Sequence, residues 1–232
     1  MIKNEALKRY VMYQLNKNDE YFSEEDLEKI TEISLNYNDT FEIDFKELLI
    51  FNNLNSLTLC NYIIDDDNLY KLLMITELKE LTLNNCILNE SSIVIATLPL
   101  SKLCLNNCKN VNNDFIYLMN SLKSLHITNS TIDINKINKL ENLELLDIGN
   151  SKIINLNDKF KLHNLTQLYI DNSNINDLTI ISNLDNLSTL GIDSTQYDRN
   201  KMIVEELKDK GLRLYLNGFI FIDRMDGVVS NV

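Results

Sequence analysis

Leucine and isoleucine recur along the chain in one spaced pattern, LxxLxLxx(N/C/S)xL, in which most of the intervening positions are polar. Successive copies begin 21 to 24 residues apart. A fixed period of this size indicates a repeat architecture, in which each copy is one structural unit. The first apolar positions of the copies are Ile30, Leu54, Leu78, Leu100, Leu122, Leu143, Leu165 and Leu187.

The LxL core of each copy predicts a short strand. Side chains alternate between the two faces of a strand, so both leucines point to one side and the residues between them to the other. One copy cannot bury its leucines alone, but stacked copies form a parallel sheet with about 4.8 Å between strands. We therefore expect an α/β solenoid: a curved parallel sheet of about eight repeats, with a leucine core and an open concave surface.

The ninth position of the pattern follows each strand, where Asn commonly bonds the turning backbone. Cys, Ser and Thr are small donors that can do part of this work, and we interpret Cys86 and Cys108 as structural thiols. An Asn stands one place earlier in most copies, as in Asn85 and Asn107. The ninth positions are Asn38, Tyr62, Cys86, Cys108, Ser130, Ser151, Ser173 and Thr195.

The segments that lead back to the next strand change along the chain. Capped short helices are predicted for residues 69–74, 93–98 and 115–119, because Asp, Asn, Glu or Ser precedes each of them. From Ile132 onward the returns shorten, which predicts extended or 3₁₀ turns.

Both ends carry segments that can cover the open ends of a solenoid. Residues 1–29 predict a helical N-cap, in which Ser23 begins a second helix. Residues 30–208 hold the repeats, and the last return is expected to be a helix over about 198–210 that stops at Gly211. Residues 209–232 form the C-terminal cap and tail, where Asn217-Gly218 between two apolar runs predicts a β-hairpin. The three parts are expected to form one continuous domain.

The 22-residue copies from Leu122 to about Tyr197 resemble the leucine-rich repeats of bacterial internalins and of phosphatase-regulating proteins. The segment Phe22-Ser23-Glu24-Glu25-Asp26-Leu27, which leads into Ile30, looks like the helical cap of internalin-type arrays. Leu83-Asn-Asn-Cys86 and Leu105-Asn-Asn-Cys108 are closer to cysteine-containing repeats. The resemblance implies a curved solenoid that binds protein through its concave face.

Composition narrows the classes of partner. The chain of 232 residues carries a formal charge of −12, which disfavours nucleic acid and anionic membranes. Residues 1–17 lack a signal-peptide pattern and no later segment is apolar enough to span a bilayer, so we expect a cytoplasmic protein. A secreted chain whose leader has been removed would look the same. The four cysteines lack CxxC spacing, and we expect no metal and no cofactor.

The concave surface is expected to hold a partner-binding site in its second half. The fifth positions there include His126, Asp147 and Tyr169, and the seventh positions include Asp171 and Asp193. His126 and Asp147 would be neighbours able to form an ion pair. Tyr169, flanked by Asp147, Asp171 and Gln167, is the expected hot spot, because tyrosine offers a large amphipathic surface and acidic neighbours select a basic partner. Gly149 and Gly191 are expected to leave hollows beside it.

Three functions remain open at this point. The leading hypothesis is a non-catalytic protein-protein interaction module that binds a basic protein surface. The second is a structural protein that forms homo-oligomers through the hairpin strand Phe219–Ile222. The third is the regulatory subunit of an enzyme. We do not expect an enzyme, because the two histidines and the few glycines provide no catalytic constellation. Asp171 and Asp193 could instead attract a weakly bound divalent ion, the less favoured use of these carboxylates.

Overall fold

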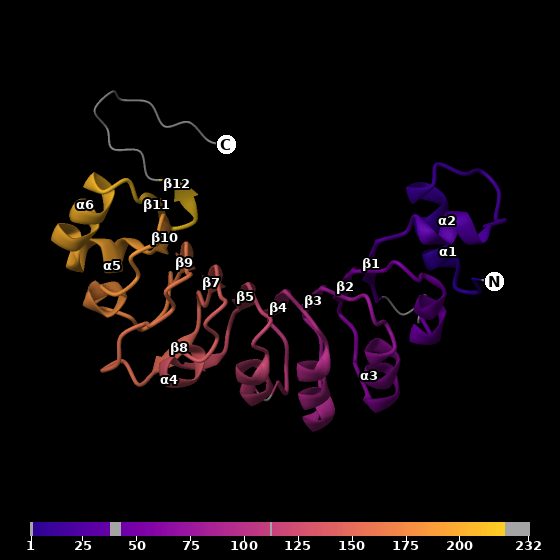
Figure 1. The fold of residues 1–232 in the computed structure, drawn as a ribbon, viewed down its shortest axis with the longest axis horizontal. Helices are drawn as coiled ribbons and strands as arrows, with labels where there is room; N and C mark the ends of the chain where they lie inside the picture. Colours follow the sequence, from indigo (N-terminus) through magenta and orange to yellow (C-terminus); the bar gives the residue numbers. More distant parts are fainter. Residues whose placement is uncertain (1, 38–42, 112, 221–232) are drawn as a thin grey trace. The chain divides into compact units, whose positions relative to one another are not determined.

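The computed structural model describes residues 2–37, 43–111 and 113–220. The chain divides into two compact units, residues 1–121 (unit 1) and 122–232 (unit 2). In each unit the strands line one side and the return segments lie on the other (Figure 1). We call the sheet surface that points away from the returns the strand face.

Unit 1 begins with two capping helices, α1 (Glu5–Gln14) and α2 (Glu24–Glu28). The Asn4 side chain accepts a hydrogen bond from the backbone N–H of Leu7 and so caps α1, which buries Leu7 and Val11. At α2, Ser23 and Asp26 bond each other's backbone N–H in a capping box. Lys17 and Ser23 hydrogen-bond the Asp26 carboxylate and hold its pKa well below the ordinary value. The helices therefore lie where the sequence predicts them.

Four strands follow in unit 1: β1 (Glu32–Asn36), β2 (Ser56–Cys60), β3 (Glu80–Asn84) and β4 (Lys102–Asn106). They pair in parallel with equivalent repeat positions side by side, for example Leu57 with Leu81 and Leu81 with Leu103. These leucines are fully buried. Because equivalent positions are paired, the leucines of successive repeats stack on one another and form the core.

The returns of unit 1 are η1 (Phe45–Ile50), α3 (Asp66–Leu73), η2 (Glu90–Thr97) and η3 (Asn113–Leu118). Helix α3 begins after Asp65, whose side chain caps Asn68, and it buries Leu69 and Leu72. The second and third predicted helices are 3₁₀ helices instead. For η2 the physical reason is visible: Asn89 makes no capping bond and donates to Asp66 Oδ1 at 2.6 Å, while the β-branched run Ile93–Ile95 disfavours α-helix.

Unit 2 contains the parallel strands β5 (Ser124–Ile127), β7 (Leu145–Asp147), β9 (Gln167–Tyr169), β10 (Thr189–Ile192) and β11 (Arg213–Leu216). Strand β12 (Phe219–Ile220) pairs antiparallel with β11. The turn between them is the predicted one: Asn217 and Gly218 both have positive φ, 52° and 82°, as a two-residue hairpin of this type requires. Phe221 and Ile222, the end of the predicted hairpin strand, lie with the tail outside the described residues.

The returns of unit 2 are mostly extended or 3₁₀, as the shortening of the pattern predicts. Strands β6 (Thr131–Asp133) and β8 (Lys152–Ile154) pair on the return side, and η4 (Leu178–Ile181) is a 3₁₀ helix. Between β6 and β8 the chain forms one α-helical turn, α4 (Ile134–Ile137).

The single helix predicted over about 198–210 is wrong in its extent. The chain forms α5 (Ser194–Arg199) and α6 (Lys201–Asp209), separated at Asn200. The Asn200 side chain accepts from the backbone N–H of Leu178 and donates to the carbonyl of Asn176, so it ties this break to the preceding return. Helix α6 ends before Gly211, as predicted, with φ of 96° at the glycine.

A column of asparagines turns the chain at the strand ends. Each has left-handed backbone geometry with φ of 53–65°, a region in which Asn is several-fold enriched among non-glycine residues. One neighbouring pair is also joined through its amide groups, from Asn107 Nδ2 to Asn85 Oδ1 at 2.8 Å. The members are Asn61, Asn85, Asn107, Asn129, Asn150 and Asn172.

The next residue along stands at the ninth repeat position, and at three of these positions its side chain donates to the preceding repeat. The thiols of Cys86 and Cys108 donate to the carbonyls of Leu59 and Leu83 at 3.4 and 3.2 Å, and the Ser151 hydroxyl donates to Ile127 at 3.2 Å. The hydrogen bond with Cys86 and burial both raise the pKa of the Cys108 thiol. Both observations agree with the structural role predicted for these thiols.

Two ninth positions differ from the prediction, and one is not described. Thr195 is exposed, and the buried Gln196 makes the bond to the preceding repeat instead, donating to the Ile170 carbonyl at 3.0 Å. The early start of α5 shifts this contact by one residue. Tyr62 packs edge-on against Tyr37 and Phe45, and Asn38 lies outside the described residues.

Candidate functional site

The strand face of unit 2 carries a continuous row of fifth-position residues, one from each strand. Pairing places His126 beside Asp147, Asp147 beside Tyr169, Tyr169 beside Gly191, and Gly191 beside Tyr215. The sequence register predicts the first four members. Tyr215 is new, because β11 continues the repeat pattern where the sequence indicated only a hairpin.

Tyr169 occupies the space above Gly191. A Cβ atom at Gly191 would lie 2.3 Å from Cδ1 of Tyr169, so the ring rests where any other residue would place its side chain. The ring reaches the next strand, where it meets Tyr215 edge-on with 6.0 Å between centroids and 62° between planes. The hollow expected at Gly191 is therefore filled by the Tyr169 ring, which remains half-buried.

Gly149 separates two carboxylates of the same surface. A Cβ atom there would lie 3.4 Å from Oδ1 of Asp147 and 3.3 Å from Oδ1 of Asp171. One carboxylate oxygen of each acid therefore lies beside Gly149. Burial raises the pKa of Asp171 above its ordinary value, and the charges of Asp147 and Asp193 raise it further.

Asp147 also contacts His126, as the sequence predicts. The imidazole Nδ1 lies 3.3 Å from Oδ2 of Asp147, and each side chain is roughly one quarter exposed, at 27% and 28%. The other carboxylate oxygen of Asp147 accepts from the backbone N–H of Gly149 at 3.1 Å. A pair this exposed contributes about 0–1 kcal/mol to stability, so its main effect is to orient the Asp147 carboxylate.

Asp193 has a structural task that the sequence interpretation missed. Its Oδ1 caps α5 by accepting from the backbone N–H of Gln196, and its Oδ2 accepts from the backbone N–H of Asn172. The run Asp193-Ser-Thr-Gln196 is a capping box, a signal available in the sequence. Both oxygens are therefore engaged within the fold.

Gln167 lies at the edge of a hollow of about 310 Å³ that the sequence did not indicate. Its carbonyl oxygen lies 3.5 Å from the Tyr169 hydroxyl, which donates to it. The third repeat positions, which line this edge, include Arg213 from β11. The hollow is lined by Gln167, Tyr169, Ser188, Thr189, Gly211, Arg213 and Tyr215.

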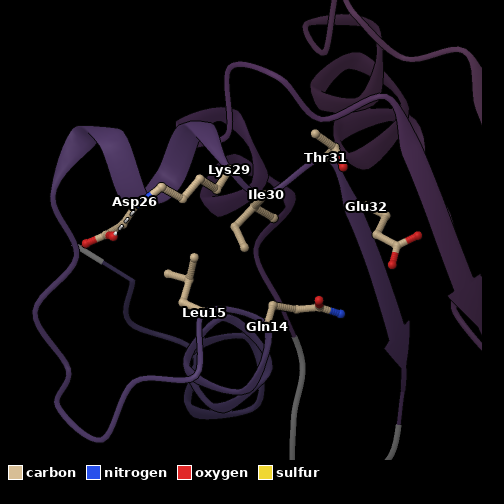
Figure 2. Close-up of a pocket in the computed structure, with 7 residues that line it drawn as sticks. All are labelled: Gln14, Leu15, Asp26, Lys29, Ile30, Thr31 and Glu32. Carbon is tan, nitrogen blue, oxygen red and sulfur yellow. Dashed lines mark hydrogen bonds and ion pairs between the residues drawn. The ribbon is translucent and has the colours of Figure 1, made fainter.

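Unit 1 holds a second hollow, of about 290 Å³, between the capping helices and the start of β1 (Figure 2). Leu15 and Ile30 form its apolar part, and Asp26 and Lys29 lie on the side of α2. The Asp26 carboxylate is already bonded by Lys17 and the Ser23 backbone. The Asp26 carboxylate on the polar side of this hollow is thus already used in capping α2.

Neither a metal cluster nor a spanning helix occurs in the part of the chain that the structure describes. No group of three or more His, Cys, Asp or Glu side chains there is arranged to hold a metal ion. No helix among the same residues has the length and apolarity needed to cross a membrane.

Comparison with solved structures identifies the fold. Internalin C2 of Listeria monocytogenes superposes with a TM-score of 0.59 and 24% identity, covering 84% of this chain and 88% of that one. The chain has the leucine-rich-repeat fold. Two other internalins of that organism, InlP and InlF, match this chain with TM-scores of 0.49 and 0.42 and identities of 17% and 15%. The match with InlP covers 82% of this chain and 64% of the InlP chain. The match with InlF covers 92% of this chain and 90% of the InlF chain.

The likeness is one of structure. No protein-family model matches this leucine-rich-repeat sequence, and no curated protein matches it. The predicted resemblance to internalins is confirmed at the level of the fold. A cytoplasmic location stays a prediction.

Proposed function

We propose that this leucine-rich-repeat chain is a non-catalytic protein-protein interaction module that binds a basic protein surface. The binding site is the strand face of unit 2, the concave face of the predicted solenoid, around Asp147, Tyr169, Asp171 and Tyr215. The observation that carries the proposal is the Tyr169 ring, held over Gly191 against Tyr215 and beside two carboxylates.

The arrangement has the properties of an interface anchor. A half-buried ring already fixed by its neighbours loses little conformational freedom when a partner covers it, and tyrosine is enriched among residues that dominate binding energy. The carboxylates of Asp147 and Asp171 favour a basic partner and accelerate its approach. The net charge of −12 acts in the same direction at long range.

The leucine-rich-repeat fold supports an interaction role in general. Repeat proteins present extended sheet surfaces on which side chains vary while the stacked core is retained. Fold likeness does not identify the partner. The choice of the strand face therefore rests on the tyrosine and carboxylate geometry.

Affinity capture from a lysate of the source organism, with mass spectrometry as readout, tests the proposal. The site variant combines Tyr169→Ala, Asp147→Asn and Asp171→Asn. The matched control combines Tyr70→Ala, Asp185→Asn and Asp209→Asn, which are exposed and lie outside the strand face. We expect a protein retained by the wild type and the control but lost by the site variant, with weaker retention at higher salt.

Equal capture by all three proteins would place the interaction elsewhere and refute the proposed site. If a captured protein were acidic at its contact surface, the charge argument would fail even with the site intact. Titration of the captured partner against each variant by calorimetry then gives the affinities directly.

Self-association is a second candidate, favoured by one observation. Phe219 is 70% exposed and lies on β12, the last described strand of the sheet. Pairing of β12 with a second copy stays a prediction, as does the role of regulatory subunit. Light scattering over a range of concentrations tests self-association, since a monomer at every concentration excludes it.

A further inference from the structure

Three rows of different chemistry cross the strand face of unit 2. Gln167, Thr189 and Arg213 pair side by side at the third repeat positions. The next row on this face contains Tyr169, Gly191 and Tyr215, and the row beyond it contains Asp171 and Asp193. Residues two apart in a strand are separated by about 6.6 Å. Within about 13 Å the surface therefore changes from basic through aromatic to acidic.

Arg213 borders the hollow of about 310 Å³ described above. Its side chain is exposed and makes no ion pair or hydrogen bond with any residue that the structure describes. The lining also supplies the Gln167 amide N–H₂ and the Tyr215 hydroxyl, while the Tyr169 hydroxyl already donates to Gln167, and Gly211 adds no side chain. No Asp or Glu is among the lining residues. The hollow thus gathers hydrogen-bond donors around one positive charge on an acidic protein.

We propose that this hollow binds a carboxylate of the protein partner while the Asp147 and Asp171 side chains hold a basic group of the same partner. The inference deepens the proposed function and rests on it. Arginine and carboxylate match in a two-bond geometry that is stronger than a neutral hydrogen bond. Arg213 lies two strands from Asp171 and three from Asp147, so a partner must present an acidic and a basic group about 16 Å apart, with the tyrosine row between them.

The order of the rows selects one orientation of the partner. Reversed binding would place the partner's acidic group against Asp171 and its basic group against Arg213, and like charges in contact are strongly unfavourable. A polyanion such as nucleic acid or a phosphorylated segment is disfavoured for the same reason, because its further charges would meet the acidic row. A single carboxylate followed by a basic group fits all three rows.

Selection from a phage-displayed library of random dodecapeptides on the immobilised full chain tests this inference. We expect the wild type to enrich peptides with an acidic and a basic residue about five positions apart, which spans about 16 Å in an extended peptide. Arg213→Glu should keep the basic residue and replace the acidic one by Lys or Arg. Lys161→Glu, a charge reversal at an exposed return residue, should select the wild-type motif.

Affinities of one selected peptide provide the second measurement. Arg213→Ala should weaken its binding about tenfold and leave the urea midpoint unchanged, because Arg213 is exposed. Enrichment of a basic residue without an acidic one, or identical motifs on wild type and Arg213→Glu, would overturn the carboxylate site and leave the proposed function standing. Enrichment of no basic residue on the wild type would refute both.

Discussion

The Tyr169 ring occupies the space that a side chain at Gly191 would need: a Cβ atom at Gly191 would lie 2.3 Å from Cδ1 of Tyr169 and 3.2 Å from two further ring atoms. The glycine is therefore needed for the position of the tyrosine ring, and through it for the contact with Tyr215. At Gly149 the closest contacts of an added Cβ would be 3.3 Å, so the same substitution there is better tolerated.

The first prediction concerns Gly191→Ala. The added methyl group should displace the Tyr169 ring, weaken partner binding about tenfold and destabilise the fold by about 1 to 3 kcal/mol. A double-mutant cycle with Tyr169→Ala, measured by urea unfolding, is the decisive control. Once the ring is absent, Gly191→Ala should have little effect; an equal cost in both backgrounds would show that the ring is not displaced.

The second prediction concerns Asp171→Asn and pH. Burial, with the nearby Asp147 charge, raises the pKa of Asp171 above its ordinary value of 3.8. A raised pKa in the folded state means that stability is highest below the unfolded-state value and falls as pH rises through the folded-state value. Asp171→Asn removes this penalty, so it should stabilise the protein at pH 7 and not below pH 3.8.

Urea unfolding of wild type and variant across this pH range provides the measurement. The same substitution should weaken binding of a basic partner, since it removes a charge from the strand face. A variant less stable than wild type at pH 7 would show that the carboxylate is stabilising there, contrary to the prediction.

The third prediction concerns the asparagine column. Asn107 has φ of 53° and its amide donates to Asn85. Asn107→Ala should destabilise unit 1 by about 1 to 2 kcal/mol, because alanine tolerates the left-handed region poorly. Asn107→Gly should cost less, since glycine adopts this conformation freely. Equal losses for the two variants, measured by chemical unfolding, would assign the effect to the amide bond and not to the backbone.

The fourth prediction separates capping from binding at Asp193. Asp193→Ala should destabilise unit 2 by about 1 to 2 kcal/mol through loss of the α5 cap. Asp193→Asn should retain most of the stability, because Asn is also a good N-cap. Partner affinity should change little with Asn if Asp193 acts mainly within the fold, and a large loss of affinity with unchanged stability would make it a contact residue.

Much of the fold can be predicted from the sequence, because aligning the successive repeats shows which positions are equivalent. The leucine pairs fix which residues face the core, and parallel pairing then fixes that His126, Asp147 and Tyr169 share a row. The returns were less predictable. Their backbone depends on side chains from adjacent repeats, as when Asn89 bonds Asp66 and leaves η2 without a cap.

The site was predicted in part for a similar reason. Periodicity places Tyr169 and Gly191 side by side, but only packing shows that the ring fills the glycine hollow. The sequence analysis does not place Tyr215 and Arg213 on this surface, because the apolar run before Asn217-Gly218 predicts one strand of a hairpin. The likeness of Leu214-Tyr215-Leu216 to Leu168-Tyr169-Ile170 is the signal that places them there. Gln167 and His126 lie on the predicted surface, and their part in binding stays a prediction.

The left-handed asparagines also bear on how such a surface can diverge. They turn the chain at the strand ends through their backbone geometry, and Asn107 also bonds Asn85, without using the side chains of the third and fifth repeat positions. Residues at those positions can therefore be substituted while each strand still ends at the same turn. Apart from Gly191, whose missing side chain the Tyr169 ring requires, residues at these two positions can be exchanged to change the partner while the turns that end the strands are kept.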